Sequence, residues 1–434
     1  MSSISSFISF ADVEAYLDRL GLFHMDMGLG RVRAVLGSMG LAHPAGAAVQ
    51  VVGTNGKGST ANFLAALARA HGLSDGLYTS PHFLSPRERI RIQGHMLSET
   101  AWVDLANRVL DAPGGDRLTY FELLTVMAAC AFRDAGVRVA VFEAGLGGSY
   151  DATSALGADV VLFASISLDH ESVLGRTVAA IATDKAGAMA QGRPALAAIT
   201  GPQSSDAMAA LAAGAARAGV PLRQVDLASG PAPGFDSRLF DADMPQRADN
   251  ARLALAGWLE LAGANQWATD PAAVRRVLAE ARLPGRLQCV AATPDMPPLI
   301  LDGAHNEDAM AALAQGVARL GVRPSVVVFS CLRDKRLGGM LPYLARLAGR
   351  DCTVVATGIP GCERSRDPDE LARELGSALG VPVETAPHMA AALEAAVRIR
   401  AGRTGGAGSD GPVLVCGSLY LLAEFYTLRP DLLG

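Results

Sequence analysis

The chain has 434 residues, of which 50% are hydrophobic and 19% charged, with a formal net charge of −5 at pH 7. This length allows two or three domains with cores of their own, and this composition excludes a disordered protein. The acidic balance argues against nucleic acid as a partner, and because there is no signal segment and no apolar run near the roughly 20 residues that span a bilayer, we expect a cytoplasmic protein without a membrane partner.

The first informative element is a predicted strand at Val49–Val52, which runs into a glycine-rich turn and then a predicted helix over Ala61–His71. This order is typical of a phosphate-binding loop, because glycines let backbone N–H groups converge on an anion and the helix N-terminus adds positive charge. Lys57 can reach the β- and γ-phosphates, and a following hydroxyl can serve phosphate or Mg²⁺. We therefore predict ATP or GTP binding; the alternative is a glycine-rich turn with a solvated lysine. The predicted nucleotide-binding residues are Gly53, Thr54, Asn55, Gly56, Lys57, Gly58, Ser59 and Thr60.

Short apolar strands then alternate with helical stretches. The predicted strands are Val137–Glu143, Asp159–Ser165 and Pro194–Ile199, and the predicted helices are Ala101–Leu110, Phe121–Ala135 and Val178–Ala190. This alternation predicts a mainly parallel sheet with helices on both faces.

Polar side chains follow several of these strands. Glu143 closes its strand and can hold Mg²⁺ against a nucleotide, or alternatively cap a turn. His170, beside Asp169, follows the next strand, where a metal or phosphate role competes with a structural one. Lys185 lies on an apolar helix, and such a lysine ordinarily extends to solvent. Ser80 follows a short strand, and its hydroxyl can serve Mg²⁺. The next segment, Arg87–Arg91, resembles a surface loop with ordinary ion pairs.

A loop at Gly230–Gly234 and a core helix at Asp249–Ala262 precede a second series of strands. These are Leu299–Asp302, Ser325–Ser330, Thr353–Thr357 and Val413–Cys416, and a glycine-rich stretch, Ala401–Gly411, predicts a mobile loop before the last one. We predict an N-terminal domain over residues 1–284 and a smaller α/β domain over 285–434. Because ligands of open α/β sheets bind beyond the carboxyl ends of strands, we expect the active site between the two domains.

Two turns of the second domain share the same sequence pattern. Leu299–Asn306 and Val413–Ser418 are each an apolar strand followed by polar residues. We predict that both turns lie on one rim, where the carboxylate or amine of a second substrate can bind. The alternative is two ordinary strand-to-helix turns.

Motifs along nearly the whole chain occur together in one family. They are Gly53–Ser59, Ser80–His82, Glu88–Ile90, Glu143–Gly148, Asp151–Thr153, Leu168–His170, Asp184–Gly187, Leu283–Arg286 and Asp302–Asn306. In this combination the chain resembles folylpolyglutamate synthases and bifunctional dihydrofolate/folylpolyglutamate synthases, which belong to the Mur ligase superfamily. Glycine rather than threonine after the loop lysine, Gly58, favours this folate branch.

The resemblance implies an α/β fold, with an N-terminal P-loop ATPase domain built on a mainly parallel sheet and a Rossmann-like C-terminal domain. It implies a monomer that ligates L-glutamate to a pteroate or folate, with ATP and Mg²⁺. The substrate carboxylate attacks the γ-phosphate to form an acyl phosphate, which the amine of glutamate then attacks. Lys57 and Mg²⁺ would neutralise the transferring phosphoryl group.

The resemblance also implies roles for single residues. Ser80, Glu143 and His170 match Mg²⁺ ligands, and Lys185 matches a lysine that is often carbamylated, which would bind a second Mg²⁺. Asn250 matches an adenine contact, while Arg286 and Asp302 match contacts to the phosphate and ribose of ATP. His305 and Ser418 lie where glutamate is expected. The residues expected to act in catalysis are Lys57, His170, Lys185 and His305.

Several positions depart from the family pattern. Ser149 and Ser154 replace an arginine and an asparagine, and Glu307 replaces a proline. These departures leave the pterin preference open. Two alternatives are an ATP-dependent amide ligase for a different carboxylate and an ATP-binding module without catalysis.

Overall fold

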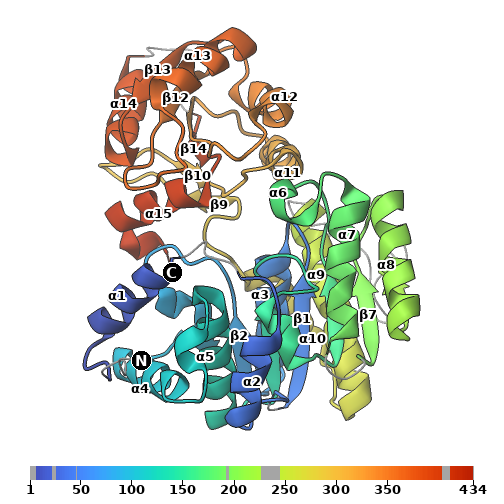
Figure 1. Ribbon diagram of the computed structural model, residues 1–434. Coiled ribbons are helices and arrows are strands. Elements are labelled where there is room, and N and C mark those ends of the chain that lie inside the picture. Colours follow the sequence, from blue (N-terminus) through green and yellow to red (C-terminus); the bar gives the residue numbers. More distant parts are fainter. Residues whose placement is uncertain are drawn as a thin grey trace. The chain divides into compact units, whose positions relative to one another are not determined.

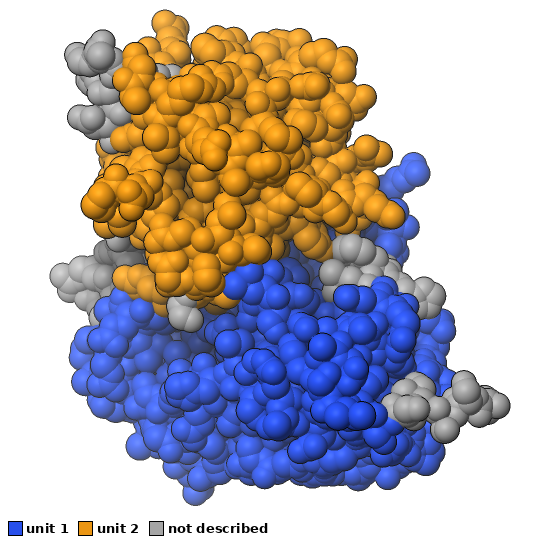
Figure 2. Space-filling view, turned by 90° about the vertical axis from the view of Figure 1, so that its left-hand side faces the viewer, with its two compact units in different colours: residues 1–241, 246–281 blue, residues 242–245, 282–434 orange. Residues whose placement is uncertain are grey.

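The computed structural model describes residues 6–21, 26–44, 46–191, 195–225, 245–402 and 411–433. The predicted loop at 230–234 and most of the predicted loop at 401–411 lie outside these residues. The chain divides into two compact units, which Figure 2 shows in different colours. Unit 1 comprises residues 1–241 and 246–281, and unit 2 comprises residues 242–245 and 282–434.

The sheet of unit 1 has eight strands among the described residues, in the order β4-β3-β2-β5-β1-β6-β7-β8. Figure 1 labels β1, β2 and β7 of this sheet. The strands are β1 (Ala47–Val52), β2 (Asp75–Tyr78), β3 (Ile90–Ile92), β4 (His95–Met96), β5 (Val139–Glu143), β6 (Val160–Phe163), β7 (Ala197–Thr200) and β8 (Leu222–Gln224). β3 is antiparallel to both of its neighbours, β2 and β4, and the other pairings of this sheet are parallel among the described residues. The prediction of a mainly parallel sheet is therefore confirmed.

Helices cover both faces of this sheet, as predicted. They are α1 (Phe10–Leu20), α2 (Gly30–Ser38), α3 (Lys57–Ala70), α4 (Glu99–Leu110), α5 (Tyr120–Asp134), α6 (Glu171–Leu174), α7 (Val178–Ala186), α8 (Ser205–Ala218), α9 (Pro245–Asn265) and α10 (Pro271–Glu280). Successive side chains of a strand point to opposite faces. In β1, Val49 and Val51 therefore pack in a core with α3, α9 and α10, while Val52 packs with α7 and α8. All six residues of β1 are buried, which places the loop that follows it at the centre of the sheet edge.

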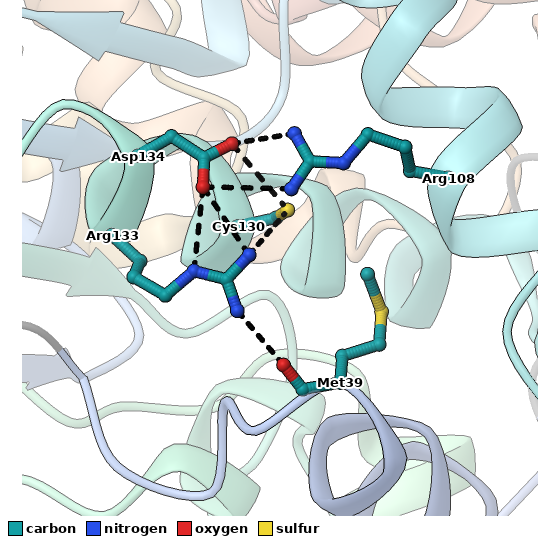
Figure 3. Close-up of polar contacts among 5 residues, drawn as sticks. All are labelled: Met39, Arg108, Cys130, Arg133 and Asp134. Carbon is teal, nitrogen blue, oxygen red and sulfur yellow. Dashed lines mark hydrogen bonds and ion pairs between the residues drawn. The ribbon is translucent and has the colours of Figure 1, made fainter.

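Helices α4 and α5 are joined by a polar cluster near the surface (Figure 3). Arg108 of α4 and Arg133 of α5 both bind the carboxylate of Asp134, at 2.5 Å and 3.2 Å. Arg133 also donates to the backbone oxygen of Met39, which follows α2. The nearby Cys130 is buried, and burial, followed by the charge of Asp134, raises the pKa of its thiol. The cluster thus connects three helices and contains no activated thiolate.

The sheet of unit 2 has six strands in the described part of the chain, in the order β13-β12-β11-β14-β10-β9. The strands are β9 (Gln288–Val290), β10 (Leu299–Leu301), β11 (Val326–Phe329), β12 (Thr353–Thr357), β13 (Val383–Ala386) and β14 (Val413–Cys416). The helices are α11 (Glu307–Arg319), α12 (Leu337–Ala348), α13 (Pro368–Leu379), α14 (Met389–Ala401) and α15 (Leu419–Leu428). Only the edge strand β9 is antiparallel to its neighbour, so the second α/β unit is confirmed. Among the described residues, no helix of either unit has the length and apolarity that crossing a membrane requires.

Candidate functional site

The glycine-rich loop lies between β1 and α3, as predicted, and its conformation requires glycine. Gly56 precedes α3 with a φ of 84°, in the left-handed region that glycine favours. A Cβ atom at this position would lie 2.2 Å from Oδ1 of Asn250 on α9. Backbone conformation and close packing therefore both exclude a larger residue. The structure also brings Asn250 against the loop, although the two are far apart in the sequence.

Two amides of the loop are committed to the neighbouring strand. The N–H groups of Thr54 and Asn55 donate to the carbonyl oxygen of Ser165, which follows β6, at 2.7 and 3.1 Å. They brace the loop and do not face an anion. The first N–H groups of α3 are the ones left without acceptors inside the helix, since a helix begins with unpaired donors. The donors available to a predicted anion therefore lie at the N-terminus of α3. Lys57 lies there too, and its Nζ donates to the carbonyl of Thr54 at 3.2 Å.

The two hydroxyl groups that are predicted to bind phosphate or metal differ in their solvent exposure. Thr60 is completely buried, and its Oγ1 has no hydrogen-bond partner within the described structure. Ser59 is half-buried. Of the two, Ser59 is the side chain that an incoming ligand can reach.

The Glu143 carboxylate lies directly against the start of α3. Glu143 ends β5, is 4% exposed, and accepts a hydrogen bond from the backbone N–H of Ser80 at 3.0 Å. A Cβ atom on Gly58 would lie 3.3 Å from Oε2 of Glu143. The glycine that follows the loop lysine thus makes room for this carboxylate. Two of the predicted metal ligands, Ser80 and Glu143, are neighbours.

Lys185 is buried, not solvated. Its side chain is 3% exposed in α7, and its Nζ donates to the carbonyl of Gly53 at 2.9 Å. Burial, followed by the nearby charge of Lys57, lowers its pKa to about 7. The expectation that this lysine extends to solvent was wrong, because it considered only the helix and not the loop that covers it.

The loop after β5 packs against the last turn of α7. A Cβ atom on Gly148 would lie 2.4 Å from the backbone oxygen of Lys185, so only glycine allows this approach. Asp184 accepts the N–H of Gly148 on its carboxylate at 3.0 Å, and its backbone oxygen accepts the Ser149 hydroxyl at 2.9 Å. Asp184 therefore fixes the helix turn that carries Lys185. Its role was missed because its partners are distant in sequence.

His170 follows β6 and precedes α6, with a φ of 51°. It is exposed, and its backbone N–H donates to Oδ1 of the adjacent Asp169 at 2.8 Å. Among the described residues, no three His, Cys, Asp or Glu side chains gather around one point as a metal cage would. The predicted ligand set contains only two such residues, Glu143 and His170, beside a hydroxyl and a lysine.

A buried polar network accounts for the serine at position 154. Gln50 of β1 donates to the hydroxyls of Thr153 and Ser154, both at 2.8 Å. Asp151 accepts the N–H groups of Gly145 and Leu146, and burial raises its pKa. Position 154 thus belongs to a satisfied hydrogen-bond network, which fixes the turn after β5.

The prediction of a surface loop at Arg87–Arg91 was also wrong for the central residues of this segment, which are buried. Glu88 and Arg89 are 7% and 3% exposed, and Ile90 begins β3. Only Arg87 forms the expected kind of surface ion pair, with Glu99 at 3.1 Å. Burial, followed by the charge of Arg89, lowers the pKa of the neighbouring His82 to about 3.

In unit 2, Asp302 follows β10 and holds the turns around it. Its carboxylate accepts the N–H groups of Leu287 at 2.7 Å and Ala304 at 2.8 Å. Burial raises its pKa, while Arg286 opposes this shift. A Cβ on Gly303 would lie 2.6 Å from Nη1 of Arg286. Arg286 and Asp302, both predicted to contact ATP, are therefore brought together.

The two strand-end turns of unit 2 lie side by side, as predicted. Strands β10 and β14 pair in parallel, and Gly417 N–H donates to the Ala304 carbonyl at 2.9 Å. His305 donates from Nδ1 to the Gly303 carbonyl at 2.8 Å, because a carbonyl can only accept, and in a neutral ring this makes Nε2 the acceptor. Ser418 is buried and caps α15 through the N–H of Tyr420.

Glu307, where the family commonly has proline, has a packing role. It is the first residue of α11, where a negative charge is favourable, and Asn306 caps the same helix. A Cβ on Gly339 would lie 2.5 Å from Oε2 of Glu307, so this carboxylate packs against the first turn of α12.

Comparison with known proteins identifies the family. A model of the Mur ligase glutamate ligase domain matches residues 285–419. The dihydrofolate synthase/folylpolyglutamate synthase of Escherichia coli is 33% identical over 417 residues, which are 94% of this chain and 93% of that protein. The chain belongs to the folylpolyglutamate synthase and dihydrofolate synthase family.

Other members of the family extend the comparison. A probable bifunctional folylpolyglutamate synthase/dihydropteroate synthase of Haloferax volcanii is 35% identical over 95% of this chain, but the chain spans only 49% of that protein. An Escherichia coli family structure in complex with DHPP and ADP matches with a TM-score of 0.83 and 30% identity, over 99% of both chains. A bifunctional folylpolyglutamate synthase/dihydrofolate synthase solved with Mn, AMPPNP and L-glutamate bound matches with a TM-score of 0.81 and 31% identity, over 99% of this chain and 100% of that chain. The α/β architecture of both units is that of this family.

Proposed function

We propose that the chain is an ATP-dependent carboxylate–amine ligase that adds L-glutamate to dihydropteroate, to reduced folates or to both. The observation that carries the proposal is the contact of the Glu143 carboxylate with Gly58 at the start of α3. This contact sets an acidic ligand beside an anion-binding helix end. Relatives solved with ADP and DHPP, and with Mn, AMPPNP and L-glutamate, support the same substrates.

The residues of unit 1 fit a nucleotide with a divalent metal. Glycine at positions 56 and 58 lets Asn250 and Glu143 approach the loop, and carboxylate and hydroxyl oxygens are the donors that Mg²⁺ prefers. We assign Ser80, Glu143 and His170 as Mg²⁺ ligands and Lys57 as the cation for the β- and γ-phosphates. Bound Mg²⁺ supplies neutralising charge during phosphoryl transfer.

Lys185 fits the carbamylated lysine of the superfamily. Only a neutral amine reacts with CO₂, and a buried lysine with a lowered pKa supplies that form near neutral pH. The carbamate would replace this amine beside Lys57 with an anion, which is a second metal ligand. Mass analysis of fresh protein should show the added CO₂, and acetate should partly rescue Lys185→Ala.

In unit 2, we assign His305 and Ser418 to the glutamate site and Arg286 and Asp302 to ATP, and in unit 1 Asn250 to adenine. Within this proposal the ATP-binding domain covers residues 1–284 and the glutamate-ligase domain 285–434. A monomer, and an active site between the two domains, stay predictions.

The decisive experiment measures ADP release with dihydropteroate and with tetrahydrofolate, each with and without glutamate. Glutamate-dependent release with either substrate supports the proposal, and the comparison tells which activity is present. Lys57→Ala should lower turnover on the order of 100-fold or more while the protein stays folded. ADP release that is indifferent to glutamate with both substrates would refute the proposal.

A further inference from the structure

The segment Thr79–Ser85, which carries Ser80, is held almost residue by residue. The backbone oxygen of Arg89 accepts the N–H of Thr79 at 2.9 Å. The Glu88 carboxylate accepts three successive backbone N–H groups, those of Phe83, Leu84 and Ser85, at 2.9, 2.6 and 2.8 Å. Two adjacent residues, Glu88 and Arg89, thus anchor both ends of this segment.

Arg89 also holds the middle of the segment. Its Nε donates to Nδ1 of His82 at 2.9 Å, and its guanidinium lies 5.2 Å from the ring centroid of Tyr120. Arg89 is 3% exposed, and within the described residues it forms no ion pair with an acidic side chain. A buried cation without an anionic partner is costly, and an apolar residue would fill the same space without that cost. The guanidinium is therefore better explained by what it orients than by stability.

The far side of the segment contacts the proposed metal site. The N–H of Ser80 donates to Oε2 of Glu143, the same oxygen that lies nearest to Gly58. A shift of the segment therefore moves the Ser80 hydroxyl and removes a hydrogen bond that orients the Glu143 carboxylate. Groups that orient metal ligands in this way typically matter about 10- to 100-fold for metal affinity or activity.

We propose that Glu88 and Arg89 are positioning residues, which hold the Thr79–Ser85 segment so that Ser80 and Glu143 present their oxygens to one divalent cation. The inference rests on the proposed function, because it takes these two residues as metal ligands. Neither Glu88 nor Arg89 touches the cation. Both act through the backbone of the segment and through His82.

The test measures Mn²⁺ affinity by electron paramagnetic resonance in the presence of AMPPNP, together with the Mg²⁺ dependence of ADP release. Glu88→Gln keeps the size of the side chain but has one acceptor oxygen for three N–H groups. Arg89→Met keeps the apolar stem and removes the guanidinium, and Arg89→Lys keeps the charge without the Nε donor. The matched control is Glu99→Gln, which breaks the neighbouring surface ion pair of Arg87.

We expect the three variants to weaken Mn²⁺ binding about 10-fold or more, with the glutamate KM changed less than about 2-fold. The control should bind Mn²⁺ as the unchanged protein does. Urea unfolding shows whether each variant is folded. If Arg89→Met does not fold, the Mn²⁺ affinity of Arg89→Lys tests the positioning role of Arg89. Folded variants that bind Mn²⁺ as tightly as the wild-type protein would overturn the proposal. A wild-type protein that binds no Mn²⁺ in the presence of AMPPNP would overturn it as well. If the unchanged protein binds Mn²⁺ but shows no glutamate-dependent ADP release, the proposed function fails, and Mn²⁺ affinity still judges the positioning role.

Discussion

At the residue scale, single glycines and buried charges bring together the residues of unit 1 to which we assign the chemistry. Gly58 admits the Glu143 carboxylate, Gly56 admits Asn250, and Lys185 is held under the loop by the Gly53 carbonyl. Each contact joins residues from different strands or helices. We therefore expect that a substitution at one of these positions can change turnover without an equal change in the free energy of unfolding.

Gly58→Ala should lower activity without lowering stability. The new Cβ would lie 3.3 Å from Glu143, which must then shift by a few tenths of an ångström. Alanine is favoured over glycine in a helix by about 1 kcal/mol, so the free energy of unfolding should stay level or rise. We expect turnover to fall by about 10-fold. Urea unfolding and ADP release measure the two effects.

The matched control for this substitution is Gly376→Ala in α13. Apart from its chain neighbours and the backbone of its own helix, no described residue has an atom within 4 Å of the added Cβ. The free energy of unfolding of this control should rise as much as that of Gly58→Ala, while its turnover stays that of the wild-type protein. If Gly58→Ala were as active as this control, turnover would not depend on the present position of the Glu143 carboxylate.

Lys185 should give stability a distinct dependence on pH. Its folded-state pKa, about 7, lies below the ordinary value of 10.5. Between these two pH values the unfolded chain binds more protons at this site than the folded protein, so stability should rise with pH. Below about pH 7 the destabilisation is fully present. Unfolding by urea in CO₂-free buffers from pH 6 to 10 should show a rise that Lys185→Met lacks, and equal slopes would contradict the buried, neutral lysine.

The helices and strands show which features the sequence pattern could predict. Continuous apolar runs such as Thr353–Thr357 and Val413–Cys416 are strands with the predicted bounds, because a strand buried on both faces needs no alternation. The strands β3, β4, β8, β9 and β13 were missed, since they are two to four residues long and partly polar. All of them except β3 are edge strands. Burial of Lys185 and Glu88 could not be predicted, because their partners come from other parts of the chain.

The polar cluster between α4 and α5 should contribute modestly to stability. Asp134→Ala removes the shared partner of Arg108 and Arg133, all three of which are partly exposed. Exposed pairs contribute about 1 kcal/mol or less, and we expect the free energy of unfolding to fall by that amount with unchanged turnover. Asp104→Ala, an exposed residue of α4, is the control. A loss as small as that of the control would show that the cluster does not stabilise the helix pair.

At the scale of the whole molecule, the proposed roles divide between the two units. The loop that would hold the phosphates belongs to unit 1, and the paired turns that would hold glutamate belong to unit 2. The sequence indicated both strand-end sites, because each follows an apolar run. It could not indicate the contacts that tie each site together, such as that between Gly417 and Ala304.

His305→Ala should therefore raise the glutamate KM strongly and the ATP KM little. It should also lower kcat, since misplacing a reacting group by about 1 Å can cost roughly 100-fold. Steady-state kinetics with each substrate varied in turn measure this split, and Lys57→Ala serves as the comparison in unit 1. Equal losses for ATP and glutamate would place the glutamate site elsewhere.

The core of unit 1 has a consequence for the newly made chain. Strand β1 and helix α3 appear early in synthesis, but the apolar face that they share is covered by Leu255 and Trp258 of α9 and Val274 of α10. Until the ribosome has released α10, this face lacks its cover, and exposed apolar surface of this kind attracts chaperones or other chains. A chain that stops before α9 would contain the whole phosphate-binding loop and still be an aggregation-prone fragment.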